Sequence, residues 1–287
     1  MPLVNLKNIL GKAKKGKYAI GAFNIYNIED ITAVILAAEE VNAPVILQAS
    51  GSALRHSTIE DIAGIVIRRA RQSIVPICLQ LDHSTNYSTI IKAIKEGFSS
   101  VMFDGSLLSY EENMAKTKEI VKIAHTLDVT VEAEVGRVGR LDDEENNFEE
   151  DLSNPKEVKQ FVSATNIDAC AVAIGTMHGM QEQKSKIDFQ LLKKIREIVN
   201  IPLVLHGSSG VIEEELTKLG TFGIQKVNVG TRLKKIFTDT LRNQLDKDPM
   251  LFDHVKLLKF AIRAVKKEVI HKITVFGSAN KAIDILQ

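Results

Sequence analysis

Residues 73–87 read Ser-Ile-Val-Pro-Ile-Cys-Leu-Gln-Leu-Asp-His-Ser-Thr-Asn-Tyr, and the fold and the chemistry of the chain meet in this stretch. The apolar run Ile74–Leu81 predicts a buried strand that stops at Asp82 and His83. Side chains alternate between the two faces of a strand, so Asp82 and His83 cannot both point inward from a regular strand. We therefore predict that the strand ends near Leu81 and that the chain turns there.

The residues that follow supply the chemistry of a turn. Ser84, Thr85 and Asn86 each have a side chain that can cap a helix beginning near Tyr87. A carboxylate and an imidazole at the carboxyl end of a strand lie where barrels and open α/β sheets place catalytic groups. The alternative is a surface Asp-His pair that caps the next helix. The remaining motifs of the chain are needed to choose between a catalytic pair and a helix cap.

Strand-like and helix-like stretches alternate along the chain. The expected strands are short, apolar and rich in β-branched residues, as in parallel sheets covered on both faces. They are Tyr18–Phe23, Pro44–Ala49, Ile74–Leu81, Ser100–Phe103, Val129–Ala133, Ala169–Ile174, Pro202–Leu205 and Gln225–Val229. Helical spacing between them covers Ile28–Val41, Tyr87–Gly97, Glu111–Leu127, Asn154–Thr165 and Phe189–Val199. Eight strand-helix units predict a (β/α)8 TIM barrel, with a doubly wound sheet as the second interpretation.

Two segments depart from this alternation. Gly136–Asp151 is strongly acidic and almost free of apolar residues, which is typical of a solvated loop and compatible with a mobile active-site flap. Residues 231–246 and 251–270 form a helical extension that we expect to pack on the barrel or on a neighbouring subunit. We therefore interpret residues 1–287 as one TIM-barrel domain with a C-terminal helical extension.

Composition excludes several classes of protein. The 287 residues carry 37 Lys and Arg against 36 Asp and Glu, a net charge of +1, so no global field favours nucleic acid. No apolar run approaches the roughly 20 residues that a membrane helix needs, and the N-terminus lacks a signal-peptide core. Cys78 and Cys170 lie in apolar strand-like runs and are expected to be buried, reduced thiols. These features predict a cytoplasmic protein that binds neither nucleic acid nor membranes.

Chemistry-bearing side chains follow the expected strands. In a barrel they share one rim, and in chain order they are Asn24, Ser50, Asp82, His83, Asp104, Glu134, His178, His206 and Asn228. Three imidazoles on one rim, those of His83, His178 and His206, predict a zinc site with an open fourth position. A single histidine in such a place is more often structural, but three at equivalent strand ends are hard to explain in that way. The remaining histidines, His56, His125, His254 and His271, are interpreted as structural.

The same rim carries two loops suited to an anion. His206-Gly207-Ser208-Ser209-Gly210 follows the seventh strand, and Asn228-Val229-Gly230-Thr231 follows the eighth. Glycines let backbone N–H groups approach an anion, and the hydroxyls add donors. Loops seven and eight form the usual phosphate-binding corner of a TIM barrel. The alternative is a pair of ordinary flexible loops.

These motifs together resemble the class II, zinc-dependent ketose-bisphosphate aldolases, such as the fructose-bisphosphate and tagatose-bisphosphate enzymes. The resemblance covers essentially the whole chain. It rests on YAIGAFNI at 18–25, APVILQAS at 43–50, LDHST at 81–85, SSVMFDGS at 99–106, VEAEVG at 131–136, AVAIGTMHGM at 171–180, IPLVLHGSSG at 201–210, KVNVGT at 226–231 and FGSANKA at 276–282.

The resemblance implies roles for individual residues. It makes His83, His178 and His206 ligands of a catalytic zinc, and Asp82 the acid/base that moves the proton of the C4 hydroxyl of the substrate. Asp104 and Glu134 match positions that hold a second divalent metal in some members. The positions that match the binding site for dihydroxyacetone phosphate are Gly179, Gly207, Ser208, Ser209, Asn228, Val229, Gly230 and Thr231. Ser50 matches a position near the aldehyde half, and Asn24 is expected to help there.

The sequence departs from the family pattern in ways that bear on the substrate. Asp142 stands roughly where relatives have a loop glutamate that assists proton transfer. Gly230 replaces the Asp of fructose-type and the Ala of tagatose-type members, and Gln181 replaces an aromatic residue. Arg232 replaces an acidic residue, and we hypothesise that it contacts a second anionic group of the substrate; the alternative is a solvated arginine at a helix start. Arg263 matches a C-terminal arginine that reaches the distal phosphate in some relatives.

The resulting hypothesis is reversible, zinc-dependent cleavage of a ketose 1,6-bisphosphate, with fructose 1,6-bisphosphate as the first candidate. The products are dihydroxyacetone phosphate and glyceraldehyde 3-phosphate. Alternatives are cleavage of tagatose 1,6-bisphosphate or another phosphorylated ketose, a barrel isomerase or Schiff-base aldolase, and a non-catalytic phosphosugar-binding barrel. The resemblance further predicts a homo-oligomer, dimer or tetramer, and is compatible with a monovalent cation.

Overall fold

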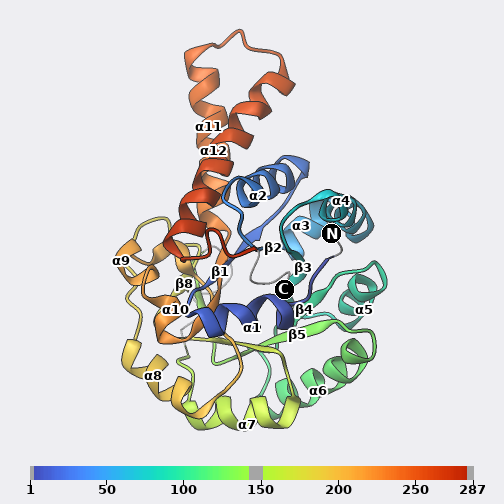
Figure 1. Cartoon of the computed structure of the whole chain (residues 1–287), viewed down its shortest axis with the longest axis vertical. Coiled ribbons are helices and arrows are strands. Elements are labelled where there is room, and N and C mark those ends of the chain that lie inside the picture. The colour runs from blue at the N-terminus through green and yellow to red at the C-terminus, as the bar shows by residue number, and fades with distance from the viewer. Residues whose placement is uncertain (1–2, 142–150, 283–287) are drawn as a thin grey trace.

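Eight parallel strands close into a barrel in the computed structural model, which describes residues 3–141 and 151–282 (Figure 1). Around the barrel the order is β1-β10-β9-β7-β5-β4-β3-β2, so strands that follow one another along the chain lie side by side. The strands are β1 (Ile20–Asn24), β2 (Val45–Ser50), β3 (Ile77–Ser84), β4 (Ser100–Phe103), β5 (Thr130–Val135), β7 (Ala169–Val172), β9 (Leu203–Leu205) and β10 (Ile224–Val229). The predicted TIM barrel is confirmed, and each expected strand overlaps an observed one.

Helices surround the barrel, as the alternating pattern predicts. They are α2 (Ile28–Glu40), α3 (Gly51–His56), α4 (Ile59–Gln72), α5 (Tyr87–Lys95), α6 (Tyr110–Thr126), α7 (Pro155–Thr165), α8 (Phe189–Ile198), α9 (Glu213–Leu216) and α10 (Leu219–Phe222). Asn86 caps α5 by accepting hydrogen bonds from the backbone N–H groups of Ser88 and Thr89. The cap therefore belongs to Asn86, which leaves Asp82 and His83 available for another task.

The barrel is closed at the amino ends of its strands by α1 (Leu6–Gly16). Leu6, Ile9 and Leu10 are fully buried and pack against inward-facing strand residues such as Ile46 and Val204. A second, larger cluster of buried apolar side chains lies between the strands and the surrounding helices. With the amino end filled by α1, the carboxyl ends of the strands are the open side of the barrel.

The carboxyl end of β3 differs from the prediction. The strand does not end near Leu81 but continues to Ser84, and its register against β4 shifts between Leu81 and Ser84. His83 lies in the left-handed region with φ of 48°. A bulge of this kind rotates one residue out of the regular alternation, so Asp82 and His83 both reach the same cavity without a turn. The expectation that only a chain turn could bring them together was wrong for this reason.

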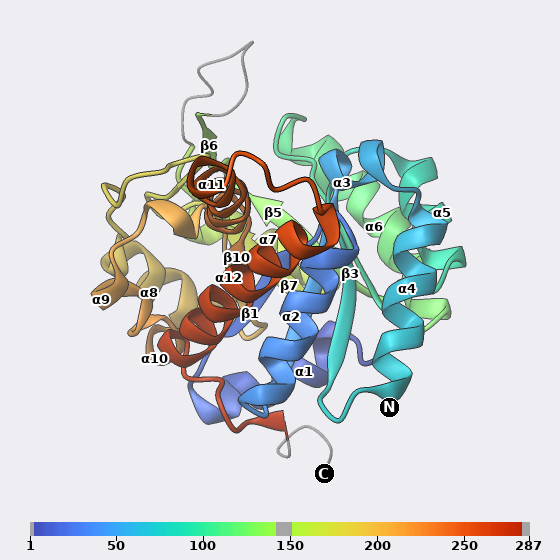
Figure 2. The ribbon, with the colours of Figure 1, turned by 90° about the horizontal axis from the view of Figure 1, so that it is seen from above.

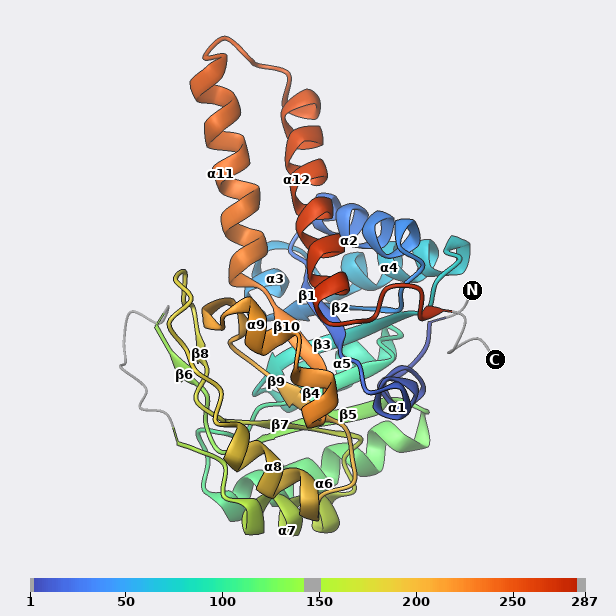
Figure 3. The same ribbon diagram turned by 60° about the vertical axis from the view of Figure 1, so that its left-hand side comes forward.

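The C-terminal extension forms a pair of antiparallel helices, α11 (Thr231–Lys247) and α12 (His254–Val275), that projects away from the barrel (Figures 1 and 3). The C-terminal part of α12 lies against α2 (Figure 2). Met250 and Phe252, at the far end of the pair, are 84% and 95% exposed. In the described parts of the chain, no helix has the length and apolar character needed to span a membrane.

Cys78 and Cys170 are free and fully buried, as predicted. Burial raises the pKa of the Cys78 thiol to about 12 and shifts the pKa of Cys170 upward as well. Both thiols are therefore unreactive parts of the core.

Candidate active site

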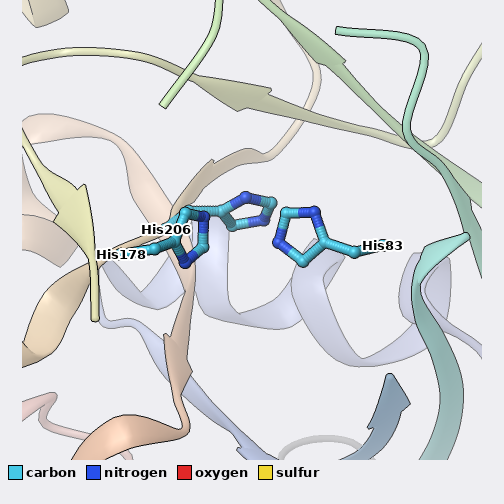
Figure 4. A group of neighbouring side chains, drawn as sticks. All are labelled: His83, His178 and His206. Atoms are coloured by element: carbon cyan, nitrogen blue, oxygen red, sulfur yellow. The ribbon is translucent and has the colours of Figure 1, made fainter. Parts of the chain in front are cut away.

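Three imidazole rings meet at the open end of the barrel (Figure 4). His83 comes from the bulge in β3, His178 from the short strand β8 (Met177–His178), and His206 directly follows β9. The ring centroids are 4.5 to 5.5 Å apart. Each ring can offer one nitrogen to a common point, with these nitrogens within 4.8 Å of one another. The structure thus brings together the three histidines that the sequence singled out.

His178 is held by a small sheet that the sequence did not predict. Strand β7 ends at Val172, and His178 lies further along in β8, which pairs in parallel with β6 (Gly139–Arg140). The carbonyl of His178 accepts a hydrogen bond from the backbone N–H of Leu141. Because β6 follows the loop after β5, that loop directly supports one of the three histidines.

Three buried nitrogens, one from each ring, fit a bound metal. His83 Nε2, His178 Nε2 and His206 Nδ1 are buried, and none has a hydrogen-bond partner among the described residues. Burying a ring nitrogen without a hydrogen-bond partner costs free energy. Three such nitrogens close together therefore indicate a ligand that all three bind. A tetrahedral divalent ion with three imidazole ligands and one open position fits this description.

Carboxylates fix the rings from behind. Asp104, which directly follows β4, places Oδ2 2.6 Å from His83 Nδ1. Burial alone would raise the pKa of Asp104, but the hydrogen bonds from His83 and Ser106 lower it well below its usual range. An ionised Asp104 that accepts from Nδ1 leaves Nε2 of His83 free to bind a metal.

His206 lies against two glutamates of β5. Its Nε2 is 3.2 Å from Glu132 Oε1. Its Nδ1 is 2.9 Å from Glu134 Oε2, but this second contact does not have the geometry of a hydrogen bond, and neither of its atoms has a hydrogen-bond partner among the described residues. Burial lowers the pKa of His206, but the two glutamates outweigh it and raise this pKa to about 9. The pKa of His178 lies well below its ordinary value. Burial is the main cause, and the neighbouring imidazoles of His83 and His206 add to it. The carboxylates therefore favour positive charge at the point where the rings meet.

A second group of possible ligands adjoins the first. His83, Asp104 and Glu134 can each offer one atom within 4.8 Å of the others. They line a cavity of about 60 Å³ together with Arg137 and Val138, among others. Asp104 and Glu134 are the two residues for which the sequence resemblance implied a second divalent metal, and the group shares His83 with the imidazole cluster.

Asp82 is almost completely enclosed, with 3% of its surface exposed. Asn24 Nδ2 donates to its Oδ2 over 2.8 Å, and Asn228 Nδ2 donates to its Oδ1 over 3.2 Å. Each carboxylate oxygen thus accepts one amide hydrogen bond, which orients the group without neutralising it. Asp82 and His83 face one cavity of about 420 Å³.

Most of the predicted binding residues line this large cavity. Those present are Asn24, Ser50, His178, Gly179, Gly207, Ser208, Ser209, Asn228, Gly230 and Thr231. The sequence did not single out the others, which are Tyr26, Gly51, Ser52, Arg55, Arg140, Met177 and Lys234. The additional cations, Arg55, Arg140 and Lys234, make the cavity suited to anionic ligands.

The loops predicted to bind an anion, residues 206–210 and 228–231, have the backbone geometry that their glycines suggested. Gly207 has φ of 68°, and a Cβ at this position would lie 2.6 Å from the carbonyl oxygen of Met177. Ser208 begins the short 3-10 helix η1 (Ser208–Gly210) and donates through Oγ to the carbonyl of Asn228 over 2.5 Å. Helix α11 starts at Thr231 with no side-chain cap, so its first N–H groups are available at the cavity wall.

Some predicted residues lie elsewhere. Val229 and Arg232 line a neighbouring cavity of about 320 Å³, and Arg232 Nε is 3.2 Å from Glu268 Oε1. Arg263 is exposed on α12 and lines neither the large cavity nor the neighbouring one. The structure therefore does not bring Arg232 or Arg263 into the large cavity. Asp142 lies outside the described residues.

The other histidines do not line the large cavity, although His271 lines the neighbouring one. His125 pairs with Asp168 and His271 pairs with Glu213, each over 2.8 Å. His56 lies on α3 and His254 begins α12. In the described parts of the chain, none of the four joins a group that could hold a metal.

Sequence reasoning missed a polar network inside the barrel. Glu132, Lys226, Gln48 and Gln80 are all fully buried. Lys226 Nζ lies 2.9 Å from Glu132 Oε2, and Gln80 Nε2 donates to the same oxygen over 2.9 Å. The signal was the alternation in VEAEV and QKVNV, which places Glu132 on the same strand face as Glu134, and Lys226 on the same face as Asn228.

Comparisons with known proteins agree with this geometry. A family model described as class-II fructose-bisphosphate aldolase matches residues 4–281. The solved YdjI aldolase from Escherichia coli K12 is 32% identical, with a TM-score of 0.87 over 98% of this chain and 99% of that one. A candidate fructose-1,6-biphosphate aldolase from Coccidioides immitis is 29% identical, with a TM-score of 0.89 over 98% of both chains. The fructose-bisphosphate aldolase of Campylobacter jejuni, 22% identical with a TM-score of 0.83 over 98% of this chain and 97% of that one, shows the same fold.

Proposed function

The chain belongs to the class II fructose-bisphosphate aldolase family, whose members are metal-dependent lyases, and we propose that it cleaves fructose 1,6-bisphosphate with zinc as its metal. The products are dihydroxyacetone phosphate and glyceraldehyde 3-phosphate, and the reaction is reversible. The observation that carries this proposal is the meeting of three buried imidazole nitrogens, none with a hydrogen-bond partner among the described residues, beside the enclosed carboxylate of Asp82.

The donor set supports zinc. Three imidazoles and an open position are the usual ligand set of a catalytic zinc site, whereas Mg²⁺ and Ca²⁺ prefer oxygen ligands. We assign His83, His178 and His206 as the ligands. Asp104 and Glu132 are the acceptors that hold the rings of His83 and His206, and Asp104 and Glu134 offer a second divalent position. The bound metal would supply Lewis-acid stabilisation for the negative charge that develops on the substrate oxygens during cleavage.

Asp82 is the group that we assign to proton transfer. In cleavage, the proton of the C4 hydroxyl passes to Asp82, the C3–C4 bond breaks with its electron pair remaining on C3, and C4 becomes the aldehyde carbon. The donors Asn24 and Asn228 hold the carboxylate in one orientation, so that it can accept the proton at a fixed place. Positioned general bases of this kind contribute about 100- to 10,000-fold in rate.

The corner formed by Gly207, Ser208 and the start of α11 is the proposed site for the phosphate on the dihydroxyacetone half. The left-handed Gly207 brings backbone close to the cavity, and the uncapped N-terminus of the 17-residue helix α11 presents N–H groups. Binding energy from this phosphate anchors the substrate with its carbonyl toward the three histidines.

Two cations that line the cavity, Arg55 and Lys234, are available for the aldehyde half. Arg55 comes from α3, which follows β2, and β1 separates β2 from β10 in the barrel. Among the described residues Arg55 has no hydrogen bond or ion pair, and Lys234 Nζ lies 4.6 Å from the centre of the Tyr26 ring. We assign the second phosphate to Arg55 and Lys234, because Arg232 is paired with Glu268 outside this cavity.

A cleavage assay tests the proposal. Fructose 1,6-bisphosphate, tagatose 1,6-bisphosphate and several ketose 1-phosphates are compared before chelation with EDTA, after chelation, and after zinc is added back. The proposal predicts the highest kcat/KM for fructose 1,6-bisphosphate, loss of activity on chelation and recovery with zinc. Retained activity after complete metal removal contradicts the metal assignment, and a higher kcat/KM for another ketose contradicts the substrate assignment.

A further inference from the structure

Lys226 is a fully buried lysine inside the barrel, and the reaction described above does not use it. Its side chain has 0% exposure, and it does not line the large cavity. Nζ lies 2.9 and 3.1 Å from the two oxygens of Glu132, and it donates to Asn228 Oδ1 over 2.7 Å. Burying an ammonium group is expensive unless it is paired and hydrogen-bonded, and these contacts satisfy it.

The contact with Asn228 determines which way its carboxamide faces. A lysine ammonium has three donors and no acceptor, so the atom of Asn228 that faces Nζ has to be the oxygen. The amide nitrogen then faces the opposite direction, where it donates to Asp82 Oδ1 over 3.2 Å. A flipped Asn228 would place its NH2 group against the ammonium and its oxygen against the carboxylate, and both contacts would be repulsive.

The other carboxamide that holds Asp82 is not constrained in this way. Gln48 Nε2 donates to Asn24 Oδ1 over 3.0 Å, and Asn24 Nδ2 donates to Asp82 Oδ2. Gln48 carries both a donor and an acceptor, and its Oε1 has no partner among the described residues. A glutamine can present either end, so only the arm through Lys226 has a fixed direction.

Lys226 also reaches the metal-binding side of the site. Glu132 accepts from Lys226 and from Gln80, and its Oε1 lies 3.2 Å from Nε2 of His206. Removing Lys226 alone would therefore leave Glu132 buried without its counter-charge and would disturb His206. A test of the Asn228 arm has to remove both charges together.

We propose that Lys226 is a positioning residue for proton transfer: by fixing the carboxamide of Asn228, it holds one oxygen of Asp82 in the orientation that accepts the proton of the substrate. This inference rests on the proposed function, because it assigns Lys226 to the step that Asp82 performs. It predicts that loss of the ammonium slows the step that needs Asp82 more than a step that does not.

Two reactions of the zinc-loaded enzyme separate these steps. Cleavage of fructose 1,6-bisphosphate requires the proton of the C4 hydroxyl to move to Asp82. Exchange of a hydroxymethyl hydrogen of dihydroxyacetone phosphate with solvent deuterium, followed by NMR, forms the enediolate and reverses without any C4 oxygen.

Three variants are compared in both reactions. They are Glu132→Gln, the pair Glu132→Gln with Lys226→Met, and the pair Glu132→Gln with Lys226→Gln. The substitution Glu132→Gln removes the negative charge but keeps an oxygen for the neighbouring side chains. The substitution Lys226→Gln keeps a hydrogen-bond donor, whereas Lys226→Met removes it.

The expected result is a selective loss. Relative to Glu132→Gln, the Met-containing pair should lower the kcat of cleavage by about 10-fold or more, while the exchange rate and the bound zinc change by less than about 3-fold. The Gln-containing pair should recover part of the cleavage rate because its amide can donate to Asn228. If the Met-containing protein does not fold, the Gln-containing pair is compared with Glu132→Gln in its place. It should then lose cleavage activity selectively, but by less than about 10-fold.

Equal loss of cleavage and exchange, or loss of neither, in an active wild-type background overturns the assignment of Lys226. Loss of bound zinc together with loss of the cleavage and exchange rates also overturns the assignment. In that case Lys226 would act through Glu132 and His206 alone. A zinc-loaded wild-type enzyme that cleaves no ketose phosphate overturns the proposed function itself, and the role of Lys226 falls with it. The two failures are therefore distinguishable.

Discussion

Asp104 Oδ2 lies 2.6 Å from His83 Nδ1, and this contact decides which nitrogen of His83 remains for a metal. An ionised Asp104 keeps a hydrogen on Nδ1 and leaves Nε2 as the free ligand atom. Substituting Asp104→Asn should therefore weaken metal binding by about 10- to 100-fold, measured as the zinc dissociation constant by competition with a chromophoric chelator.

The matched control is Ser106→Ala, which removes one donor to Asp104 and leaves the contact with His83 in place. It should change zinc affinity far less than Asp104→Asn does. Zinc affinity of Asp104→Asn within about 2-fold of the wild type would show that the contact does not prepare His83. Binding of a second equivalent of metal by the wild type, lost in Asp104→Asn, would assign Asp104 to the second position as well.

Gly207 has a positive φ, and a Cβ added there would meet backbone atoms of Met177. Gly207→Ala forces a non-glycine residue to φ of 68° and brings Cβ to 2.6 Å from the backbone oxygen of Met177, the residue before His178. We expect a loss of about 1–3 kcal/mol in the free energy of unfolding and weaker substrate binding. Urea unfolding and KM for fructose 1,6-bisphosphate measure the two effects.

Gly64→Ala is the control for this substitution, because Gly64 lies inside α4 and a Cβ there meets nothing within 4 Å. Alanine should stabilise the helix by about 0.5–1 kcal/mol without changing KM. If both substitutions had the same effect on stability and on KM, the close approach of Gly207 to Met177 would not matter.

The proposed contact between Arg55 and the phosphate of the aldehyde substrate predicts a change in substrate specificity. Arg55→Ala should raise KM for glyceraldehyde 3-phosphate in the condensation direction by about 10-fold, since one charge-assisted hydrogen bond contributes about 1.5 kcal/mol or more. The KM for unphosphorylated glyceraldehyde should hardly change. Arg232→Ala is the control, because Arg232 lies with Glu268 in the neighbouring cavity. A larger effect from Arg232→Ala would support the hypothesis drawn from the sequence instead.

Asp30 makes stability depend on pH. Burial is the main cause that raises its pKa from 3.8 to about 6, and the hydrogen bond from the backbone N–H of Tyr26 only partly opposes it. The folded state therefore favours the protonated carboxyl, and this contribution is complete below pH 3.8 and is lost as the pH rises through 6. Asp30→Asn, which mimics the protonated form, should gain about 1–3 kcal/mol over the wild type at pH 7.

Urea unfolding of both proteins between pH 4 and pH 7 checks the sign. The advantage of Asp30→Asn should be small near pH 4 and should grow up to about pH 7. An advantage that stays constant over this range, or that shrinks as the pH rises, contradicts the raised pKa of Asp30.

The barrel could be predicted because its strands are short, apolar and regularly spaced, and burial of such runs dominates folding. The position of His83 could be predicted only in part. Alternation alone excludes a shared cavity for Asp82 and His83, whereas the structure inserts a bulge with His83 at φ of 48°. A bulge depends on the register with β4, and register is a relation between two strands that neither sequence segment specifies by itself.

The sequence did not predict the polar network inside the barrel or the position of Arg232, and the two reasons differ. Glu132 and Lys226 meet because barrel closure brings β5 and β10 across one interior, and their separation of 94 residues hides this in the sequence. Arg232 directly follows Thr231 at the start of α11, but successive helical residues point in different directions. Thr231 lines both cavities, whereas Arg232 lines the neighbouring one alone.

The central claim is the division of labour between Asp82 and the three histidines. The most direct measurement is zinc content together with the cleavage rate of fructose 1,6-bisphosphate for Asp82→Ala, with His83→Ala as the matched variant. Asp82→Ala should retain stoichiometric zinc and lose about 100- to 10,000-fold in kcat, whereas His83→Ala should lose zinc and turnover together. Near-normal turnover of zinc-loaded Asp82→Ala would contradict the account, because the enclosed carboxylate would then not be the group that moves the proton.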